Sequence, residues 1–204
     1  IKTTTATPAL ATRALDVLSL ESSAKPQSFY SGQKLTKGYQ YITTRDGTTL
    51  SANVTFPAGP PPYPTVISYS GYEPSKPGAP VDDGTLAGLC DGLPVICDAP
   101  NDPSALISGL FQYATVNVNI RGTGCSGGAF DFFETMQLLD GYDVVETVAA
   151  QDWVMNGKVG MVGLSYPGIS QLFTATTEPP HLAAIAPMSV IGSAHTTMLP
   201  GGIL

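Results

Sequence analysis

The fold is decided by the stretch Lys158-Val159-Gly160-Met161-Val162-Gly163-Leu164-Ser165-Tyr166-Pro167-Gly168-Ile169. A short apolar run ends at Gly163, a serine follows two residues later, and helical character continues to residue 176. Strand, tight turn with serine at its apex, and helix form the pattern of a nucleophile elbow. Side chains at Gly163 or Gly168 would collide with a neighbouring element, and the helix would direct its first amides at a developing oxyanion. The competing interpretation is an ordinary loop with an incidental serine.

The composition favours a heavily buried sheet in one domain. Of the 204 residues, 43 % are hydrophobic and 12 % are charged, and the charged share is about half the usual globular value. The net charge is −7 and lysine and arginine total only 9. We therefore expect no nucleic-acid partner. No apolar run approaches the ~18 residues that a bilayer span requires, so we expect no membrane-spanning segment.

The first part of the chain and the cysteines bear on the compartment. Residues 1–37 are interpreted as an N-terminal arm that starts without methionine and is rich in Thr, Ala and Ser. Such an arm is typical of a mature secreted protein, so we expect a secreted or cell-envelope location, with the cytoplasm as the alternative. Cys90 and Cys97 could form a disulfide or remain thiols, and Cys125 is left over. Their spacing does not resemble a zinc site, and we expect no metal or cofactor.

Strands and helices alternate along the chain. Two strand-like runs, residues 39–44 and 48–56, flank Arg45-Asp46-Gly47, which is a hairpin signal. Later segments predict strands at 65–70, 112–120, 158–162 and 182–188, and helices at 104–111, 140–154 and from Ser165 onward. This alternation indicates a mostly parallel sheet with an antiparallel hairpin at its start. Ser165 would then lie at the carboxyl end of a central strand, where such sheets bind ligands.

A glycine-rich segment, Arg121-Gly122-Thr123-Gly124-Cys125-Ser126-Gly127-Gly128, follows the strand predicted at 112–120. It lacks the Lys-Ser/Thr ending of a phosphate-binding loop, and no helix begins directly after it. We therefore prefer a loop that passes close to the nucleophile turn over a nucleotide site.

From about Gly38 to its last residue, the chain resembles the cocaine-esterase-like acyl esterases and Xaa-Pro dipeptidyl-peptidases, a branch of the α/β-hydrolases. The resemblance rests on Asn119-Ile120-Arg121-Gly122-Thr123-Gly124, Gly141-Tyr142-Asp143-Val144-Val145-Glu146, Gly163-Leu164-Ser165-Tyr166-Pro167-Gly168 and Pro179-Pro180-His181-Leu182. It implies an α/β-hydrolase fold and a serine hydrolase that cleaves an ester or the amide after an Xaa-Pro dipeptide.

The resemblance also implies three site residues. Ser165 would be the nucleophile, and the backbone N–H of Tyr166 would be one oxyanion donor. The phenol of Tyr72 would be the other donor, with Tyr69 as the fallback, because Gly71 stands where many relatives have proline. The substrate would be a small-molecule ester or a peptide.

The partners that would activate the serine are not evident. After Ser165 the only carboxylate is Glu178, and the only histidines are His181 and His195. In this fold the acid and the base follow the serine on separate later loops, so we expect neither histidine to be the base. We therefore expect residues 38–204 to be the N-terminal portion of a catalytic domain, ending before its cap, with acid and base beyond Leu204. The alternative is a non-catalytic α/β-hydrolase-like binding domain. The choice between ester and peptide, and the oligomeric state, stay open.

Overall fold

The computed structural model describes residues 25–72, 75, 103–191, 193, 196, 197 and 201. The predicted Cys90–Cys97 disulfide, His195 and residues 1–24 of the predicted arm lie outside this part of the chain. Cys125 has a free, exposed thiol. Within the described residues, no helix combines the length and the apolar character that crossing a membrane would require.

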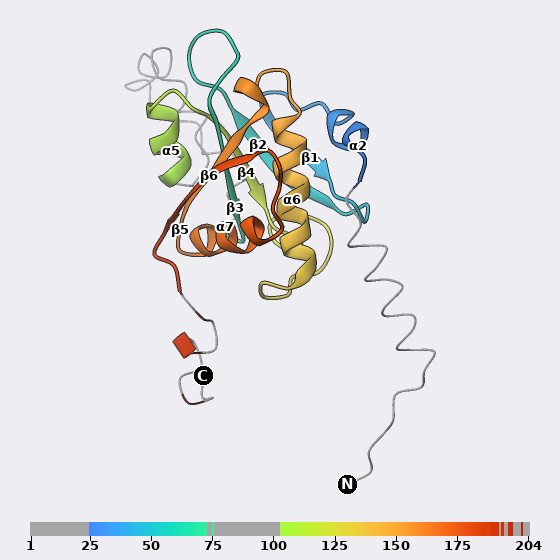
Figure 1. The fold of residues 1–204 in the computed structure, drawn as a ribbon, viewed down its shortest axis with the longest axis vertical. Helices are drawn as coiled ribbons and strands as arrows, with labels where there is room; N and C mark the ends of the chain where they lie inside the picture. The colour runs from blue at the N-terminus through green and yellow to red at the C-terminus, as the bar shows by residue number, and fades with distance from the viewer. Residues whose placement is uncertain are drawn as a thin grey trace, which may run out of the picture.

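Six strands and their connecting helices make up the described chain (Figure 1). In chain order the elements are α2 (Gln27–Ser31), β1 (Gly38–Thr43), β2 (Thr49–Thr55), β3 (Thr65–Ser70), α5 (Pro103–Leu110), β4 (Ala114–Asn119), α6 (Thr135–Ala149), η1 (Met155–Gly157), β5 (Val159–Leu164), α7 (Tyr166–Thr176) and β6 (Leu182–Met188). Each predicted strand and helix is confirmed, although several bounds differ.

The six strands form one mixed sheet in the order β1-β2-β4-β3-β5-β6. β1 and β2 form the predicted hairpin, and β2 is antiparallel to β4. The remaining pairs, β4 with β3, β3 with β5 and β5 with β6, are parallel. The predicted fold class, a mostly parallel sheet with an antiparallel start, is therefore confirmed.

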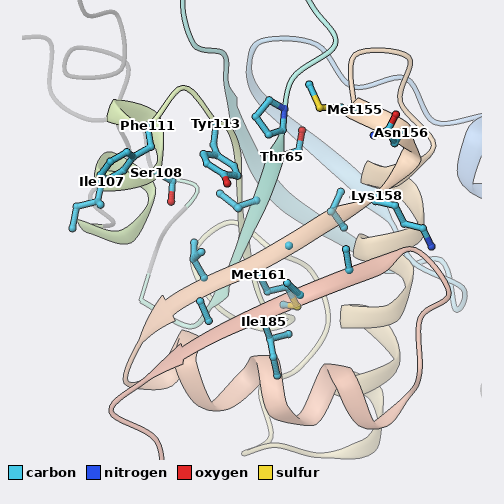
Figure 2. Close-up of a pocket in the computed structure, with 18 residues that line it drawn as sticks. Thr65, Ile107, Ser108, Phe111, Tyr113, Met155, Asn156, Lys158, Met161 and Ile185 are labelled. Atoms are coloured by element: carbon cyan, nitrogen blue, oxygen red, sulfur yellow. The ribbon is translucent and has the colours of Figure 1, made fainter.

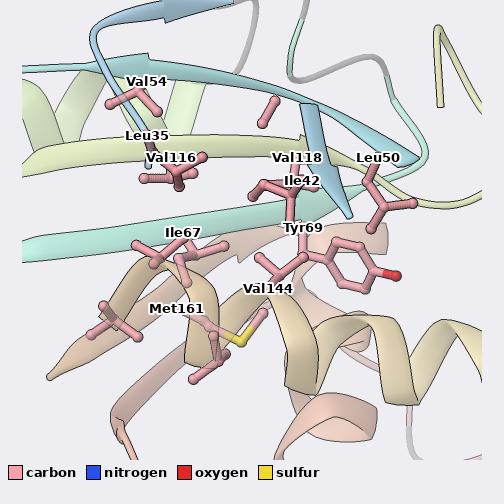
Figure 3. Packing of buried hydrophobic residues seen from close by; sticks show 14 of the residues in the cluster. Leu35, Ile42, Leu50, Val54, Ile67, Tyr69, Val116, Val118, Val144 and Met161 are labelled. Atoms are coloured by element: carbon pink, nitrogen blue, oxygen red, sulfur yellow. The ribbon is translucent and has the colours of Figure 1, made fainter. Parts of the chain in front are cut away.

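The main core lies between the sheet and α6. Val144 and Val148 of α6 are fully buried against the strands, among them Ile67 of β3 and Val118 of β4 (Figure 3). β-Branched and other apolar residues fill these central strands because both faces of a parallel sheet need to be covered. This packing fixes the strand ends from which the candidate site residues project.

The chain connections of β3 and β5 place a topological switch point at the carboxyl ends of these two strands. β3 connects through α5 to β4 on one side, whereas β5 connects through α7 to β6 on the other. Neighbouring parallel strands whose connections leave in opposite directions form the ligand-binding switch point of open α/β sheets. Tyr72 follows β3 by two residues and Ser165 follows β5 directly. The topology alone therefore brings these two residues to one place.

The bounds of α6 differ most from the prediction, since the helix begins and ends five residues earlier than residues 140–154. The side chain of Glu134 caps its start by accepting hydrogen bonds from the N–H groups of Met136 and Gln137. After the helix, Trp153 donates its indole N–H to the carbonyl of Leu35 at 2.9 Å. The apolar residues after Ala149 are thus covered by loop contacts, although their spacing in the sequence resembles that of a helix.

Two arginines tie the loops at one end of the sheet to α6. Arg45, in the hairpin turn, pairs with fully buried Asp143 at 2.8 Å. Arg121, at the start of the glycine-rich loop, donates two 2.6 Å bonds to buried Asp140 and also reaches Asp46 at 3.1 Å. Burial raises the pKa of Asp140 to about 6 in spite of these bonds. Charge-assisted bonds of this kind hold the glycine-rich loop in one position.

Candidate active site

Ser165 occupies a strained turn between β5 and α7. Its backbone dihedrals are φ 67° and ψ −118°, the conformation of the first central residue of a type II′ turn, which favours glycine. The N–H of Ser165 donates to the carbonyl of Met188 at 2.9 Å, and the carbonyl of Ser165 accepts from the N–H of Ile169 at 2.8 Å. These bonds hold the serine in a conformation that its own side chain disfavours.

The two glycines that flank the serine are required by close packing. A Cβ atom on Gly163 would lie 2.5 Å from Cβ of Pro167. A Cβ atom on Gly168 would lie 2.4 Å from the carbonyl oxygen of Met188, the oxygen that also accepts the N–H of Ser165. Side chains at either position would therefore push the helix or the neighbouring strand away from the turn. The predicted steric role of both glycines is confirmed.

Tyr72 stands directly beside the serine. Its phenol oxygen lies 3.4 Å from Oγ of Ser165. Its backbone N–H donates to Oγ of Ser70, the last residue of β3, at 3.0 Å, which fixes the turn after the strand. The side chain is 63 % exposed, so its hydroxyl is accessible to a bound molecule. A residue 93 positions earlier in the sequence thus reaches the apex of the elbow.

Tyr166 is the first residue of α7, and its backbone N–H belongs to the first turn, whose N–H groups have no intrahelical acceptor. The side chain is buried, and its phenol donates to Oε1 of Gln137 at 3.1 Å. Burial raises the pKa of this phenol, and neighbouring Tyr72 raises it further. The hydroxyl therefore stays protonated and keeps donating to Gln137.

Tyr69, the fallback for Tyr72, lies elsewhere. Its side chain is buried in the core, and its phenol donates to the carbonyl of Gln137 at 3.0 Å. Burial raises its pKa well above the usual value, and the charge of Asp140 adds to this. Successive side chains of a strand alternate between faces, and Tyr69 faces α6. The fallback prediction is therefore wrong.

His181, the histidine among the described residues, lies at the end of the sheet opposite to Ser165. Nδ1 of His181 is 2.7 Å from Oε2 of Glu146, a buried carboxylate of α6. The carbonyl of His181 accepts from the N–H of Val159 at the start of β5. Ser165 lies six residues further along this strand, about 20 Å away at the usual rise per residue. His181 is thus too far from Ser165 to accept its proton directly.

Exposed apolar side chains surround the elbow. Leu164 precedes the serine, Met188 ends the neighbouring strand β6, and Val190 follows that strand by two residues. Phe130 and Phe132 lie on the loop before α6. The rings of Phe130 and Phe132 lie 6.4 and 6.0 Å from that of Tyr166. The segment after the glycine-rich loop therefore packs against the ring of Tyr166. Within the part of the chain that the structure describes, no group of three or more His, Cys, Asp or Glu residues could hold a metal.

An apolar groove lies away from Ser165 (Figure 2). It has a volume of about 740 Å³ and is lined by Ile107 and Phe111 near α5, by the first residues of β5 and by Ala184 and Ile185 of β6. Figure 2 shows α5 and α7 on opposite sides of β5 and β6, and the groove is on the side of α5. Right-handed crossovers require this separation of the two helices. The groove is thus not part of the serine site.

Gln137 is the residue of this region that sequence reasoning missed. It is buried in the first turn of α6 and accepts hydrogen bonds from the phenols of Tyr166, which follows Ser165, and Tyr69, which lies on β3. In the sequence it looks like an ordinary polar residue near a helix start, and no motif marks it. Only the packing of α6 against β3 and α7 brings it under the site.

The chain is similar to several known proteins. The family model of the X-Pro dipeptidyl-peptidases (S15 family) matches residues 46–204. A curated protein of Mycobacterium bovis, provisionally named a serine esterase, is 29 % identical over 171 residues, covering 80 % of this chain and 26 % of that protein. A CocE/NonD family hydrolase from Staphylococcus aureus is 26 % identical with a TM-score of 0.62, covering 78 % of this chain and 28 % of that one.

A more distant structure supports the fold alone. The aminopeptidase from a marine sediment Thaumarchaeota archaeon gives a TM-score of 0.63 at 18 % identity, covering 87 % of this chain and 28 % of that one. The chain spans about a quarter of the length of the curated relatives that it matches.

Proposed function

Because the chain belongs to the X-Pro dipeptidyl-peptidase (S15) family, we propose that it carries the nucleophile and the oxyanion donors of a serine hydrolase. The scissile bond is an acyl bond, either a carboxylic ester or the amide after an Xaa-Pro dipeptide. The family match favours the amide, and the relative named as a serine esterase favours the ester.

The observation that carries the proposal is the meeting of Tyr72 and Ser165 across the switch point, with 3.4 Å between phenol and hydroxyl oxygens. Oγ of Ser165 would attack the substrate carbonyl carbon, and the carbonyl oxygen would become an oxyanion. The phenol of Tyr72 and the backbone N–H of Tyr166 would donate to that oxyanion. Donors already in place before the reaction stabilise the transition state more than the ground state.

The rest of the reaction follows from the chemistry of acyl transfer. Collapse of the tetrahedral intermediate expels the alcohol or amine and leaves the acyl group on Oγ of Ser165. Water then attacks this ester and releases the acid, restoring the serine. Both steps need a general base, because a serine hydroxyl is a poor nucleophile at its own pKa.

We place that base and its orienting acid outside the described residues, in the longer protein to which the relatives correspond. The support is the position of His181, which pairs with Glu146 about 20 Å from Ser165 at the usual strand rise. The 204-residue chain by itself should then hydrolyse esters no faster than its Ser165→Ala variant.

The experiment is hydrolysis by the longer protein, with p-nitrophenyl acetate and an Xaa-Pro p-nitroanilide as substrates. Ser165→Ala should abolish turnover of at least one of them. Tyr72→Phe should reduce kcat by about 10²-fold, the usual effect of removing one oxyanion donor. Tyr113→Phe removes the hydroxyl of a partly exposed tyrosine near the groove beside α5 and is the matched control. Unchanged turnover in Tyr72→Phe would remove Tyr72 from the proposed site.

A non-catalytic binding domain is the second candidate, favoured by the separation of His181 from Ser165. It predicts that neither substrate is hydrolysed by the longer protein in a Ser165-dependent way. An ester or dipeptide analogue would still bind, as equilibrium dialysis would detect.

A further inference from the structure

Gln137 joins three segments beneath the candidate site. Its side-chain Oε1 accepts the phenol of Tyr166 at 3.1 Å and the N–H of Phe133 at 3.2 Å. Its Nε2 donates to the carbonyl of Asp131. Its backbone carbonyl accepts the phenol of Tyr69 at 3.0 Å. The residue is 3 % exposed, so these bonds are shielded from competing water and hold their geometry.

The ring of Tyr166 is fixed on two sides. It stacks on Phe133 with 4.7 Å between ring centroids and an interplanar angle of 21°. The ring of Tyr72 meets it edge to face, with 5.8 Å between centroids and an interplanar angle of 65°. Oε1 of Gln137 accepts from both the hydroxyl of Tyr166 and the N–H of Phe133, so this side chain joins the two members of the stacked pair.

Tyr166 is linked to both oxyanion donors of the proposed mechanism. Its own backbone N–H is one of them, and its ring supports the ring of Tyr72, which supplies the other. The Tyr72 side chain is 63 % exposed, so it depends on such a contact to keep its hydroxyl 3.4 Å from Ser165. A shift of the Tyr166 ring would therefore move both donors relative to the serine.

We propose that Gln137 is a positioning residue that acts through the phenol of Tyr166 to align the two oxyanion donors with Ser165. This inference rests on the proposed function, since the donors have a role only if Ser165 attacks a carbonyl. Gln137 itself touches neither the serine nor the space in front of it. Its effect must therefore appear in the stabilisation of the transition state and not in the binding of the substrate.

The test uses the longer, active protein and a series of variants. Tyr166→Phe removes the hydroxyl but keeps the ring and its stacking, and Gln137→Leu removes the acceptor. Each should lower kcat about 10-fold with KM unchanged. The oxyanion donors would still be present but misplaced, so their contacts with the transition state would weaken. Binding of a boronic acid that mimics the tetrahedral intermediate should weaken by the same factor. The double variant should be no slower than the slower single variant, because both changes break one interaction.

Tyr63→Phe is the matched control. Tyr63 is 8 % exposed, as Tyr166 is, and donates its phenol to the carbonyl of Gly59 at 2.8 Å in a region remote from the elbow. It should keep the wild-type kcat and boronic acid affinity. An equal loss of kcat in Tyr63→Phe would mean general loosening and would overturn the positioning role.

The outcomes separate this inference from the proposed function. Suppose that wild-type turnover depends on Ser165 but Tyr166→Phe keeps the full kcat and the full affinity for the boronic acid. This result would overturn the positioning role of Gln137 and leave the proposed function standing. A rise in KM with kcat unchanged would also overturn the positioning role, as would strictly multiplicative losses in the double variant. If Gln137→Leu fails to fold, Tyr166→Phe still decides the matter through kcat and boronic acid affinity. A wild-type protein without Ser165-dependent turnover overturns both.

Discussion

Replacing Ser165 by glycine should stabilise the protein, although glycine usually destabilises. The serine is held at φ 67° and ψ −118°, where a Cβ atom collides with the local backbone. Such a conformation costs a non-glycine residue about 1–3 kcal/mol. Ser165→Gly removes this strain, whereas Ser165→Ala keeps the Cβ atom and loses only the hydroxyl. The pair of variants therefore isolates the backbone strain from the loss of the side-chain oxygen.

The expected difference follows from two opposing terms. Relief of strain favours glycine by about 2 kcal/mol, the middle of the usual range. The greater freedom of glycine in the unfolded chain costs about 0.5–1 kcal/mol relative to alanine. The free energy of unfolding of Ser165→Gly should thus exceed that of Ser165→Ala by about 1 kcal/mol. The hydroxyl contributes little to this comparison, because both variants lack it.

The assay is urea unfolding of the 204-residue chain, followed by fluorescence of its single tryptophan, Trp153. Ser28 supplies the control, since it is exposed within α2. There Ser28→Gly should be less stable than Ser28→Ala by about 0.5–1 kcal/mol, the ordinary helix propensity difference. If glycine is also less stable than alanine at position 165, the serine is not strained and the elbow geometry described above is refuted.

Two further predictions concern Gly168 of the elbow and Asp46 of the hairpin turn between β1 and β2. Gly168→Ala should lower the free energy of unfolding by about 1–3 kcal/mol through overpacking, because its Cβ would lie 2.4 Å from the carbonyl of Met188; Gly160→Ala, whose nearest contact would be 3.5 Å, should lower it less in the same urea titration. Burial disfavours the charged form of Asp46, but its hydrogen bonds and Arg121 outweigh burial and lower its pKa to about 2. Its ionised form therefore stabilises the fold above about pH 4 and this contribution is lost as the pH falls toward 2. The stability difference between wild type and Asp46→Asn should shrink over that range in urea titrations, and a difference independent of pH would contradict the shifted pKa.

Much of the sheet could be predicted because its signals are local. Asp46-Gly47 marks a turn by its backbone preferences, and the β-branched run before Ser70 marks a buried strand. Gly163 and Gly168 mark the elbow, since close packing on both sides of the serine leaves room only for glycine. The conformation of these residues depends on their neighbours in the sequence, so it can be predicted without knowledge of distant contacts.

The candidate site could be predicted only as far as its motif extends. Ser165 and Tyr72 meet because β3 and β5 are neighbours in the sheet, a consequence of topology that the resemblance anticipated. Tyr69 is the fallback in the sequence because Gly71 stands where many relatives have proline, but strand alternation turns its side chain toward α6. The position of Gln137 under Tyr166 depends on contacts 29 residues apart, which no local pattern records.

The bounds of α6 differ from the prediction, and the burial of its acidic residues has no signal in the sequence, for a related reason. The apolar residues after Ala149 repeat at helical spacing, but they are covered by loop contacts such as that between Trp153 and Leu35. Asp140 and Asp143 lie on a helix where acidic residues usually face solvent, yet both are fully buried. Their partners Arg121 and Arg45 come from distant loops, and only the folded chain reveals that the charges are paired.

Covalent capture of Ser165 tests the central claim most directly. The longer protein would be treated with a fluorophosphonate, digested and examined by mass spectrometry, with Ser165→Ala as the control. We predict one phosphonyl adduct on the peptide that contains Ser165, no adduct on this peptide in the control, and loss of hydrolysis in step with labelling. Full hydrolytic activity with Ser165 unmodified, or with the adduct on another serine, would contradict the account.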